Sequence, residues 1–304
     1  MMLNEAQLAV IVAQALPGER LAGMVKLTDD RCRLILAGGS HAIVQLFAAP
    51  AAAQTAVAAL RLLRGEFDLP VPVLRGSDTD GVVVGQPYLL AGDLPGVPLA
   101  QVYGQIGDEQ LYRIGRQLGA AAYRIHRLAC GRFGALAGAD ALAADDARSY
   151  GMARLEQALV QAAAAGVVYV PTAAQMPSWF RGVYQPIGRQ AALICGGFTP
   201  ATIMVQQHEG HWRLSGLLGW EHAIGWDPAW EHVRLLDALG GANAFGLRVG
   251  YGNGYDELNQ RTYEQVREPV MRPYRFLLKL EALAAVREPV AIRRLRAVLN
   301  ALME

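Results

Sequence analysis

The stretch "LICGGFTPATIMVQQHEGHWRLSGLLGWEHAIGWDP", Leu193–Pro228, holds the pattern that decides the fold. Two apolar segments, Thr202–Val205 and Leu214–Leu218, flank a polar turn that ends in Gly210. This pattern predicts a β-hairpin. Glycines stand shortly before the first segment and directly after the second. The two ends of a hairpin lie close together and commonly carry functional side chains. Here we expect them to carry glycine.

The composition predicts a folded protein with no broad electrostatic preference. The chain has 304 residues, of which 53% are hydrophobic and 18% are charged, so it can bury a sizeable core. The formal net charge of +1 argues against general attraction to nucleic acid or to an anionic membrane. No apolar run is long enough to span a bilayer. We therefore expect neither nucleic acid nor membrane as a partner.

The cysteines and histidines give no pattern of a metal site or a disulfide framework. The three cysteines are scattered, and no pair has the spacing of a CxxC motif. The six histidines include no pair with the spacing of metal ligands. These features predict a cytoplasmic protein without a metal centre. The first residues predict an amphipathic helix capped by Asn4 rather than a signal peptide.

Residues 1–91 have the pattern of a small β-rich lobe. Short apolar segments between polar turns predict about five strands, with residues 82–85 among the strand segments. A helix is inserted after the third strand and begins at Pro50, because proline is favoured in the first helical turn. This lobe is followed by a short link near residues 90–96.

Residues 92–304 are mostly helical in pattern. Apolar residues recur at helical spacing on both sides of the hairpin. Gly250–Glu257 is interpreted as a loop. The whole chain therefore predicts an α+β protein with the layout of a kinase. A small antiparallel-sheet N-terminal lobe with one helix would face a larger, mostly helical C-terminal lobe that carries the hairpin, with a cleft between them.

Four segments carry motifs in a consistent order along most of the chain. They are "LRLLRGEFDLPVPVL", "PYLLAGDLPGVPL", "LGAAAYRIHRLACGRFGAL" and "LLGWEHAIGWDPAWEHV". Together they resemble a helix with its strand entry, the interlobe hinge, the helix with an LH pair and the "viDwe.a..gdP..Dl" segment of the aminoglycoside phosphotransferase and choline kinase-like family. The resemblance implies a protein kinase-like fold and, for active members, phosphotransfer from ATP with magnesium.

The side chains that perform chemistry in that family are absent from the matching positions. "CGGFTPATIM" stands where the family reads roughly "HgDlhpgNil", so that Cys195 takes the place of the His. Gly197 takes the place of the catalytic Asp and Thr202 that of the Asn. Gly219 stands where the family has a magnesium-binding Asp. The resemblance therefore implies that no catalytic group is intact and that no metal is bound.

The N-terminal lobe departs from the family in the same direction. Gln45 holds the place of the Lys or Arg that grips the phosphates, and no acid stands between Asp30 and Glu66 to pair with it. The resemblance also places three cofactor-binding positions at the hinge, and these are Leu90, Ala91 and Asp93.

These departures predict a pseudokinase that binds a small molecule, a nucleotide or a protein partner and needs no cofactor. A catalytic carboxylate typically contributes 10²–10⁴-fold to rate, and magnesium prefers carboxylate oxygens, which glycine cannot supply. One alternative is an active phosphotransferase that uses ATP and magnesium through relocated acids, Glu221 and Asp227. A second alternative is a structural partner in a larger assembly, with a homodimer as one form.

Three further features have a structural and a functional interpretation. Trp220, Trp226 and Trp230 are expected to pack in the core, with a ligand-stacking wall as the alternative. Cys195 is expected to be a buried thiol rather than a nucleophile, because no His adjoins it. The arginines of the last helix are expected on a solvated face, with a surface for an anionic ligand or a partner as the alternative.

Overall fold

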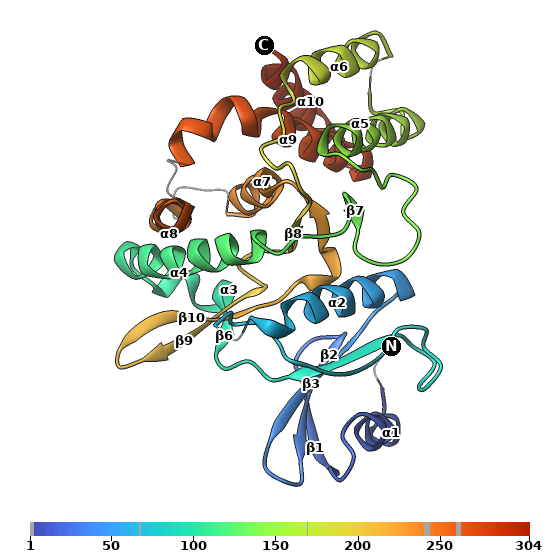
Figure 1. Cartoon of the computed structure of the whole chain (residues 1–304), viewed down its shortest axis with the longest axis vertical. Helices are drawn as coiled ribbons and strands as arrows, with labels where there is room; N and C mark the ends of the chain where they lie inside the picture. The colour runs from blue at the N-terminus through green and yellow to red at the C-terminus, as the bar shows by residue number, and fades with distance from the viewer. Residues whose placement is uncertain (1–2, 67, 169, 240–243, 260–262) are drawn as a thin grey trace.

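The N-terminal lobe is built on one antiparallel sheet (Figure 1). The computed structural model describes residues 3–304 apart from 67, 169, 240–243 and 260–262. The strands of this sheet are β1 (Leu21–Lys26), β2 (Arg31–Leu36), β3 (His41–Leu46), β4 (Leu74–Asp78) and β5 (Tyr88–Gly92). They pair in the order β1-β2-β3-β5-β4. The last of these five strands along the chain, β5, therefore lies inside the sheet and leads into the C-terminal lobe.

Two helices cover opposite faces of this sheet. Helix α1 (Glu5–Ala15) starts with the predicted cap, because the Asn4 side chain accepts a hydrogen bond from the Gln7 backbone N–H and the Gln7 side chain accepts one from Asn4. Helix α2 (Pro50–Leu62) starts at the predicted proline and continues into the short 3-10 turn η1 (Leu63–Gly65). Alternate strand residues point to α1 or to α2, because side chains alternate along a strand.

The C-terminal lobe contains two small sheets beside its helices. The first has the order β10-β9-β6 and the second the order β7-β11-β8. The strands are β6 (Val97–Pro98), β7 (Gly134–Ala135), β8 (Ala192–Ile194), β9 (Ile203–His208), β10 (His211–Leu217) and β11 (Ile224–Trp226). Strands β9 and β10 are the predicted hairpin, and they run longer than predicted because the turn is tight, with Glu209 and Gly210 between the strands.

The remaining elements are helices, most of which gather at the end of the molecule opposite α1 (Figure 1). They are α3 (Leu99–Val102), η2 (Tyr103–Gln105), α4 (Asp108–His126), α5 (Ala147–Ala164), α6 (Val170–Val183), η3 (Trp220–His222), α7 (Pro228–Ala238), α8 (Phe245–Asn259), α9 (Tyr263–Ala285) and α10 (Pro289–Met303). In the part of the chain that the structure describes, no helix has the length and apolar character needed to cross a bilayer.

The predicted loop at Gly250–Glu257 is wrong, because these residues belong to α8. Two of its glycines, Gly250 and Gly254, lie against the backbone of α4. A Cβ atom at Gly250 would lie 2.9 Å from the carbonyl carbon of Tyr112, and one at Gly119 would lie 2.7 Å from the Tyr255 backbone nitrogen. Glycine at these positions therefore permits close helix packing rather than chain flexibility, which outweighs its low helix propensity.

The predicted strand at residues 82–85 is also wrong. This segment forms a turn between β4 and β5, and Val82 is exposed. The side chain of Asp78 accepts hydrogen bonds from the backbone N–H groups of Asp80, Gly81 and Val83, which fixes the turn. A short apolar run cannot distinguish a strand from a turn by itself. Here the nearby carboxylate of Asp78 binds the backbone N–H groups and stabilises the turn.

The two lobes share a hydrophobic core on the α2 side. One buried cluster contains Ala56 and Leu60 of α2 together with Leu217 and Trp220 from the hairpin end of the C-terminal lobe. The cleft between the lobes is therefore closed at its back by packed side chains.

Candidate functional site

The two glycines at the hairpin ends contact each other through their backbones. A Cβ atom built at Gly197 would lie 3.0 Å from the Cα of Gly219 and closer still to its carbonyl oxygen. One built at Gly219 would lie 2.9 Å from the carbonyl oxygen of Gly197, and Gly219 has a φ of +91°. The hairpin thus brings together the positions predicted from its sequence, and neither has room for a side chain unless the backbone at the other glycine moves.

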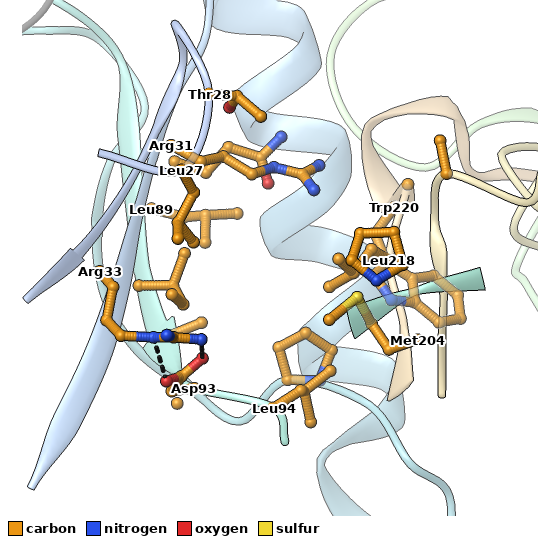
Figure 2. A pocket seen from close by; sticks show the side chains of 18 of the residues that line it. Leu27, Thr28, Arg31, Arg33, Leu89, Asp93, Leu94, Met204, Leu218 and Trp220 are labelled. Atoms are coloured by element: carbon orange, nitrogen blue, oxygen red, sulfur yellow. Dashed lines mark hydrogen bonds and ion pairs between the residues drawn. The ribbon is translucent and has the colours of Figure 1, made fainter. Parts of the chain in front are cut away.

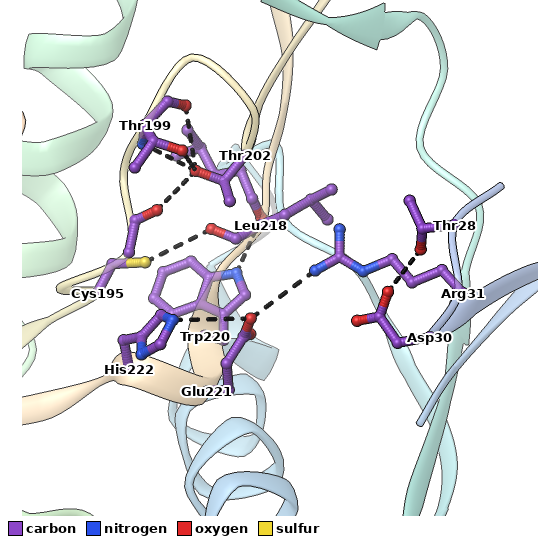
Figure 3. A network of polar contacts seen from close by, with 12 residues as sticks. Thr28, Asp30, Arg31, Cys195, Thr199, Thr202, Leu218, Trp220, Glu221 and His222 are labelled. Carbon is purple, nitrogen blue, oxygen red and sulfur yellow. Dashed lines mark hydrogen bonds and ion pairs between the residues drawn. The ribbon is translucent and has the colours of Figure 1, made fainter. Parts of the chain in front are cut away.

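Thr202 closes the same loop (Figure 3). Its hydroxyl donates a hydrogen bond to the Gly197 carbonyl over 2.6 Å and accepts one from the Thr199 backbone N–H over 2.8 Å. The carbonyl of Gly219 accepts a hydrogen bond from the His222 backbone N–H over 3.2 Å. The oxygens that these three positions offer are therefore engaged within the loop.

Gly197, Thr202 and Gly219 do not fit a magnesium ion. Magnesium takes near-octahedral oxygen ligands at about 2.0–2.1 Å and is usually held by at least one carboxylate. The two glycines provide no side chain, and their backbones fill the space where carboxylates would project. Among the described residues, no group of three or more His, Cys, Asp and Glu side chains is arranged to hold a metal ion.

Asp227 lies behind the loop and outside the cleft. It is fully buried, and its carboxylate accepts hydrogen bonds from the backbone N–H groups of Ile187, Gly188 and Ala229. The bond to Ala229 caps the start of α7. Burial raises the pKa of Asp227, although its three backbone donors act in the opposite direction. Asp227 therefore holds chain segments together and does not reach the cleft.

Glu231 supports the loop from the same side. Its Oε2 accepts a hydrogen bond from the Gly196 backbone N–H over 3.0 Å, and no described residue bonds to its Oε1. Burial raises the pKa of Glu231 to about 7. Cys195 is fully buried, and burial raises the pKa of its thiol well above the ordinary value. This thiol lacks the exposure and the lowered pKa of a nucleophile.

A cavity of about 310 Å³ lies between the lobes (Figure 2). Its walls are mostly apolar. Leu27 and Leu89 lie on the sheet side, and Met204, Leu218 and Trp220 lie on the opposite side. Its size is at the small end of the range for small-molecule pockets. Gln45, Gly219 and Glu221 also line this cavity, and so it contains several of the positions singled out from the sequence.

The three hinge positions do not share one face. Ala91 and Asp93 line the cavity, whereas Leu90 is buried on the α1 side of the sheet. Alternation along β5 explains this difference, because successive side chains point to opposite faces. Of the hinge residues predicted from the sequence, only Ala91 and Asp93 can contact a ligand in this cavity.

Two arginines of the cleft were missed in the sequence. Arg31 and Arg33 lie two residues apart on β2, so both side chains point into the cavity while Cys32 is buried on the α1 side. Arg31 is directly opposite Gln45 in the pairing of β2 with β3. The positive charge absent from β3 is therefore present on the neighbouring strand. The alternation of "RCRLIL" is the signal that could have revealed it.

The two arginines differ in their partners. The Arg33 Nε lies 2.6 Å from a carboxylate oxygen of Asp93. The nearest Arg31 nitrogen lies 3.9 Å from the Glu221 carboxylate, which is beyond hydrogen-bond range, and no described residue accepts a hydrogen bond from the buried Arg31 Nε (Figure 3). Arg33 is thus charge-paired with Asp93 at the hinge, whereas Arg31 has only Glu221 at 3.9 Å, although the buried Nε of each arginine lacks a hydrogen-bond partner among the described residues.

Two of the three tryptophans pack away from the cleft. Trp226 and Trp230 are almost completely buried, and the guanidinium of Arg154 lies 4.8 Å and 4.6 Å from their ring centroids. Trp220 lines the cavity, and its indole N–H donates a hydrogen bond to the Leu217 carbonyl over 2.8 Å. A wall of three tryptophans therefore does not form, and Trp220 alone contributes an aromatic surface.

The sheet lobe, the helical lobe and the cleft between them define a kinase-like phosphotransferase fold. The structure of aminoglycoside phosphotransferase APH(4)-Ia is similar, with 12% identity, a TM-score of 0.63 and coverage of 99% of this chain and 98% of that chain. A thermostable mutant of it, in a ternary complex with ADP and hygromycin B, has 12% identity, a TM-score of 0.68 and coverage of 98% of both chains. A Thermobifida fusca protein assigned as a fructosamine-3-kinase has 18% identity, a TM-score of 0.66 and coverage of 97% and 96%.

The family follows from the sequence profile as well. The profile of the phosphotransferase enzyme family matches residues 25–269, and the chain belongs to that family. A search of curated protein sequences finds no match.

Proposed function

We propose that this protein is a non-catalytic member of the phosphotransferase family that binds a small molecule in the cleft between its lobes. One observation carries the proposal: the backbones of Gly197 and Gly219 occupy each other's side-chain space. In the resembling family these two positions carry the catalytic acid and a magnesium ligand. The resident groups at this place are peptide units, which do not act as a general base and offer magnesium no carboxylate.

The chemistry of phosphoryl transfer supports this proposal. Catalysis of that reaction consists mostly of positioning and of neutralising the charge of the transferred phosphoryl group. A triphosphate in this cleft would lack a cation ligated at Gly219, and Gln45 would face it with a neutral amide. The ADP and hygromycin B of the structural neighbour are ligands of that protein. We propose that this chain requires neither ATP nor magnesium.

A second candidate function is phosphotransfer with a relocated acid. Glu221 lines the cavity beside Gly219, and Arg31 supplies a positive charge opposite Gln45. Asp227 cannot take part, because it is fully buried and bound to three backbone N–H groups. This candidate function therefore depends on Glu221 alone.

A pair of measurements separates the two functions. The first is the thermal shift that ATP causes with magnesium and with EDTA. We expect no metal-dependent shift, and a shift of several degrees that EDTA abolishes would contradict the proposal. The second is sustained ATP consumption across a panel of hydroxyl acceptors. Consumption that is lost in Glu221→Gln but kept in Glu209→Gln, a matched change of an exposed turn carboxylate, would establish the active alternative.

We further propose a reducing compartment, such as the cytoplasm, for this protein. Its three cysteines are free thiols, and two of them, Cys32 and Cys195, are buried. Free buried thiols are typical of proteins in reducing compartments.

A further inference from the structure

We infer that the cleft binds a small apolar monocarboxylate, with the carboxylate held by Arg31. This inference rests on the proposed function, because it assigns the ligand class of the same cavity. The ligand would place its carboxylate against the Arg31 guanidinium at the start of β2 and its apolar body against Leu89, Leu218 and Trp220 (Figure 2).

The charge balance of the cavity limits an anionic ligand to a single negative charge. Its charged lining residues are two arginines and two acids, Arg31, Arg33, Asp93 and Glu221, so they sum to zero. Arg33 is already neutralised by Asp93 at 2.6 Å. Arg31 has no carboxylate within hydrogen-bond range, because Glu221 lies 3.9 Å away, and a di- or trianion without a cation would leave more negative charge uncompensated in a mostly apolar space than a monoanion would.

The geometry of Arg31 favours a carboxylate. The Arg31 side chain is only 17% exposed, and its buried Nε has no hydrogen-bond partner among the residues that the structure describes. An unsatisfied buried donor is costly, and an incoming acceptor would remove that cost. A guanidinium binds a carboxylate through two parallel hydrogen bonds, which a neutral hydroxyl cannot reproduce.

Glu221 competes with such a ligand. Its carboxylate lies 3.9 Å from Arg31, too far for a hydrogen bond but close enough to repel a second carboxylate placed on the same guanidinium. Removal of Arg31 and removal of the Glu221 charge should therefore change ligand affinity in opposite directions. If the ion pair between Arg31 and Glu221 served only to hold the cleft in shape, both changes would lower the affinity for the ligand.

The test is isothermal titration calorimetry with octanoate, 1-octanol and ATP with and without magnesium. Octanoate should bind, and 1-octanol should bind at least about tenfold more weakly. Arg31→Gln should weaken octanoate binding about tenfold to hundredfold, and Glu221→Gln should tighten it several-fold. Arg31→Lys should give an intermediate affinity, because it keeps the charge but loses the planar fork. The matched control is Arg20→Gln, an exposed arginine of the same lobe outside the cavity, and it should change nothing.

The outcomes separate this inference from the proposed function. Equal binding of octanoate and 1-octanol, or full affinity in Arg31→Gln, would overturn the monocarboxylate assignment and leave a non-catalytic binding cleft. Magnesium-dependent binding of ATP without binding of octanoate would overturn both. If Arg31→Gln unfolds, the tightening in Glu221→Gln decides the matter, and its absence counts against the carboxylate site.

Discussion

The two sides of the segment from Cys195 to Glu231 show opposite chemistry. On the cleft side, Gly197 and Gly219 meet through bare backbone. On the rear side, Asp227 and Glu231 are fully buried carboxylates that accept hydrogen bonds from backbone N–H groups. Burying a carboxylate costs free energy, which backbone donors offset.

This difference shows that the acids of a kinase-like lobe have separable tasks. The rear acids connect α7 to the loops around it, and the fold needs them whether or not a reaction takes place. The cleft positions have no such structural task for an acid. The whole architecture therefore forms with glycine at both cleft positions, and substitutions on the two sides should have unequal effects.

The largest effect is expected from Asp227→Ala. This change removes a buried carboxylate that accepts hydrogen bonds from one buried and two partly buried backbone N–H groups, and it should lower the free energy of unfolding by about 3–5 kcal/mol. Urea denaturation measures it. Asp237→Ala on the same helix is the control, because Asp237 is partly exposed in an ion pair with Lys279 and should cost less than about 1 kcal/mol. Equal losses of stability in both variants would show that the buried carboxylate on the rear side has no special structural task.

The next largest effect is a pH dependence of the free energy of unfolding, which we attribute to Glu231. Its pKa is about 7 in the folded protein and 4.5 as the ordinary value, so the folded state retains a proton that the unfolded state has lost. The stability contributed by this proton is full below pH 4.5 and is lost as pH rises towards 7, by about 3 kcal/mol in total. Urea midpoints at pH 5 and pH 8 should show this loss in the natural protein and not in Glu231→Gln.

His126 gives the opposite slope and must be separated from Glu231. Burial lowers its pKa from 6.5 to about 3, so the unfolded state gains a proton first and stability falls as pH decreases through that range. Measurement of the difference between the natural protein and Glu231→Gln at each pH cancels the His126 contribution. A difference that does not vary between pH 5 and pH 8 would contradict the assignment to Glu231.

A smaller effect is expected on the cleft side from Gly197→Ala. The added methyl group overlaps the Gly219 backbone and should lower the free energy of unfolding by about 1–3 kcal/mol. Gly104→Ala is the matched control, since a Cβ atom there meets nothing within 4 Å. Thermal or urea unfolding compares the two variants. A Gly197→Ala protein as stable as the control would show that the two backbone segments separate easily and leave room for a side chain.

The smallest effect is expected from Gln45→Lys, which adds a positive charge to β3 at the position where the family resemblance implies one. The new ammonium would lie opposite Arg31, and like charges directly opposite in an antiparallel pair destabilise by less than about 1 kcal/mol. Unfolding in low and in high salt would reveal the repulsion, because salt screens it. An increase in stability at low salt would show that an anionic group near Arg31 dominates this part of the cleft.

Much of the architecture could be predicted from local patterns. The cap at Asn4, the helix start at Pro50 and the hairpin followed from short-range signals that the tertiary structure leaves intact. The loop predicted at Gly250–Glu257 was wrong because glycine content indicates flexibility only when no other backbone approaches, and here α4 does. That contact joins segments far apart in the chain, so local patterns do not contain it.

The candidate site was only partly accessible to sequence reasoning. The order of the motifs placed Gly197, Gly219 and Gln45 near one another, because matching the motifs assigns each residue to a position in the family's fold. It could not show that the two glycines fill each other's space. It also missed Arg31, because charge was sought on the strand where the family has it, and a neighbouring strand can deliver charge to the same spot.

The close contact between α4 and α8 has a consequence for how relatives of this protein could be recognised. Gly246, Gly250 and Gly254 recur at intervals of one helical turn, and each faces the α4 backbone. Substitution of a catalytic acid is selected against only in proteins whose catalysis is needed. Substitution of any of these three glycines by a larger residue would force the helices apart in every relative, active or not. A search signature built on this glycine ladder would therefore outlast one built on reactive groups.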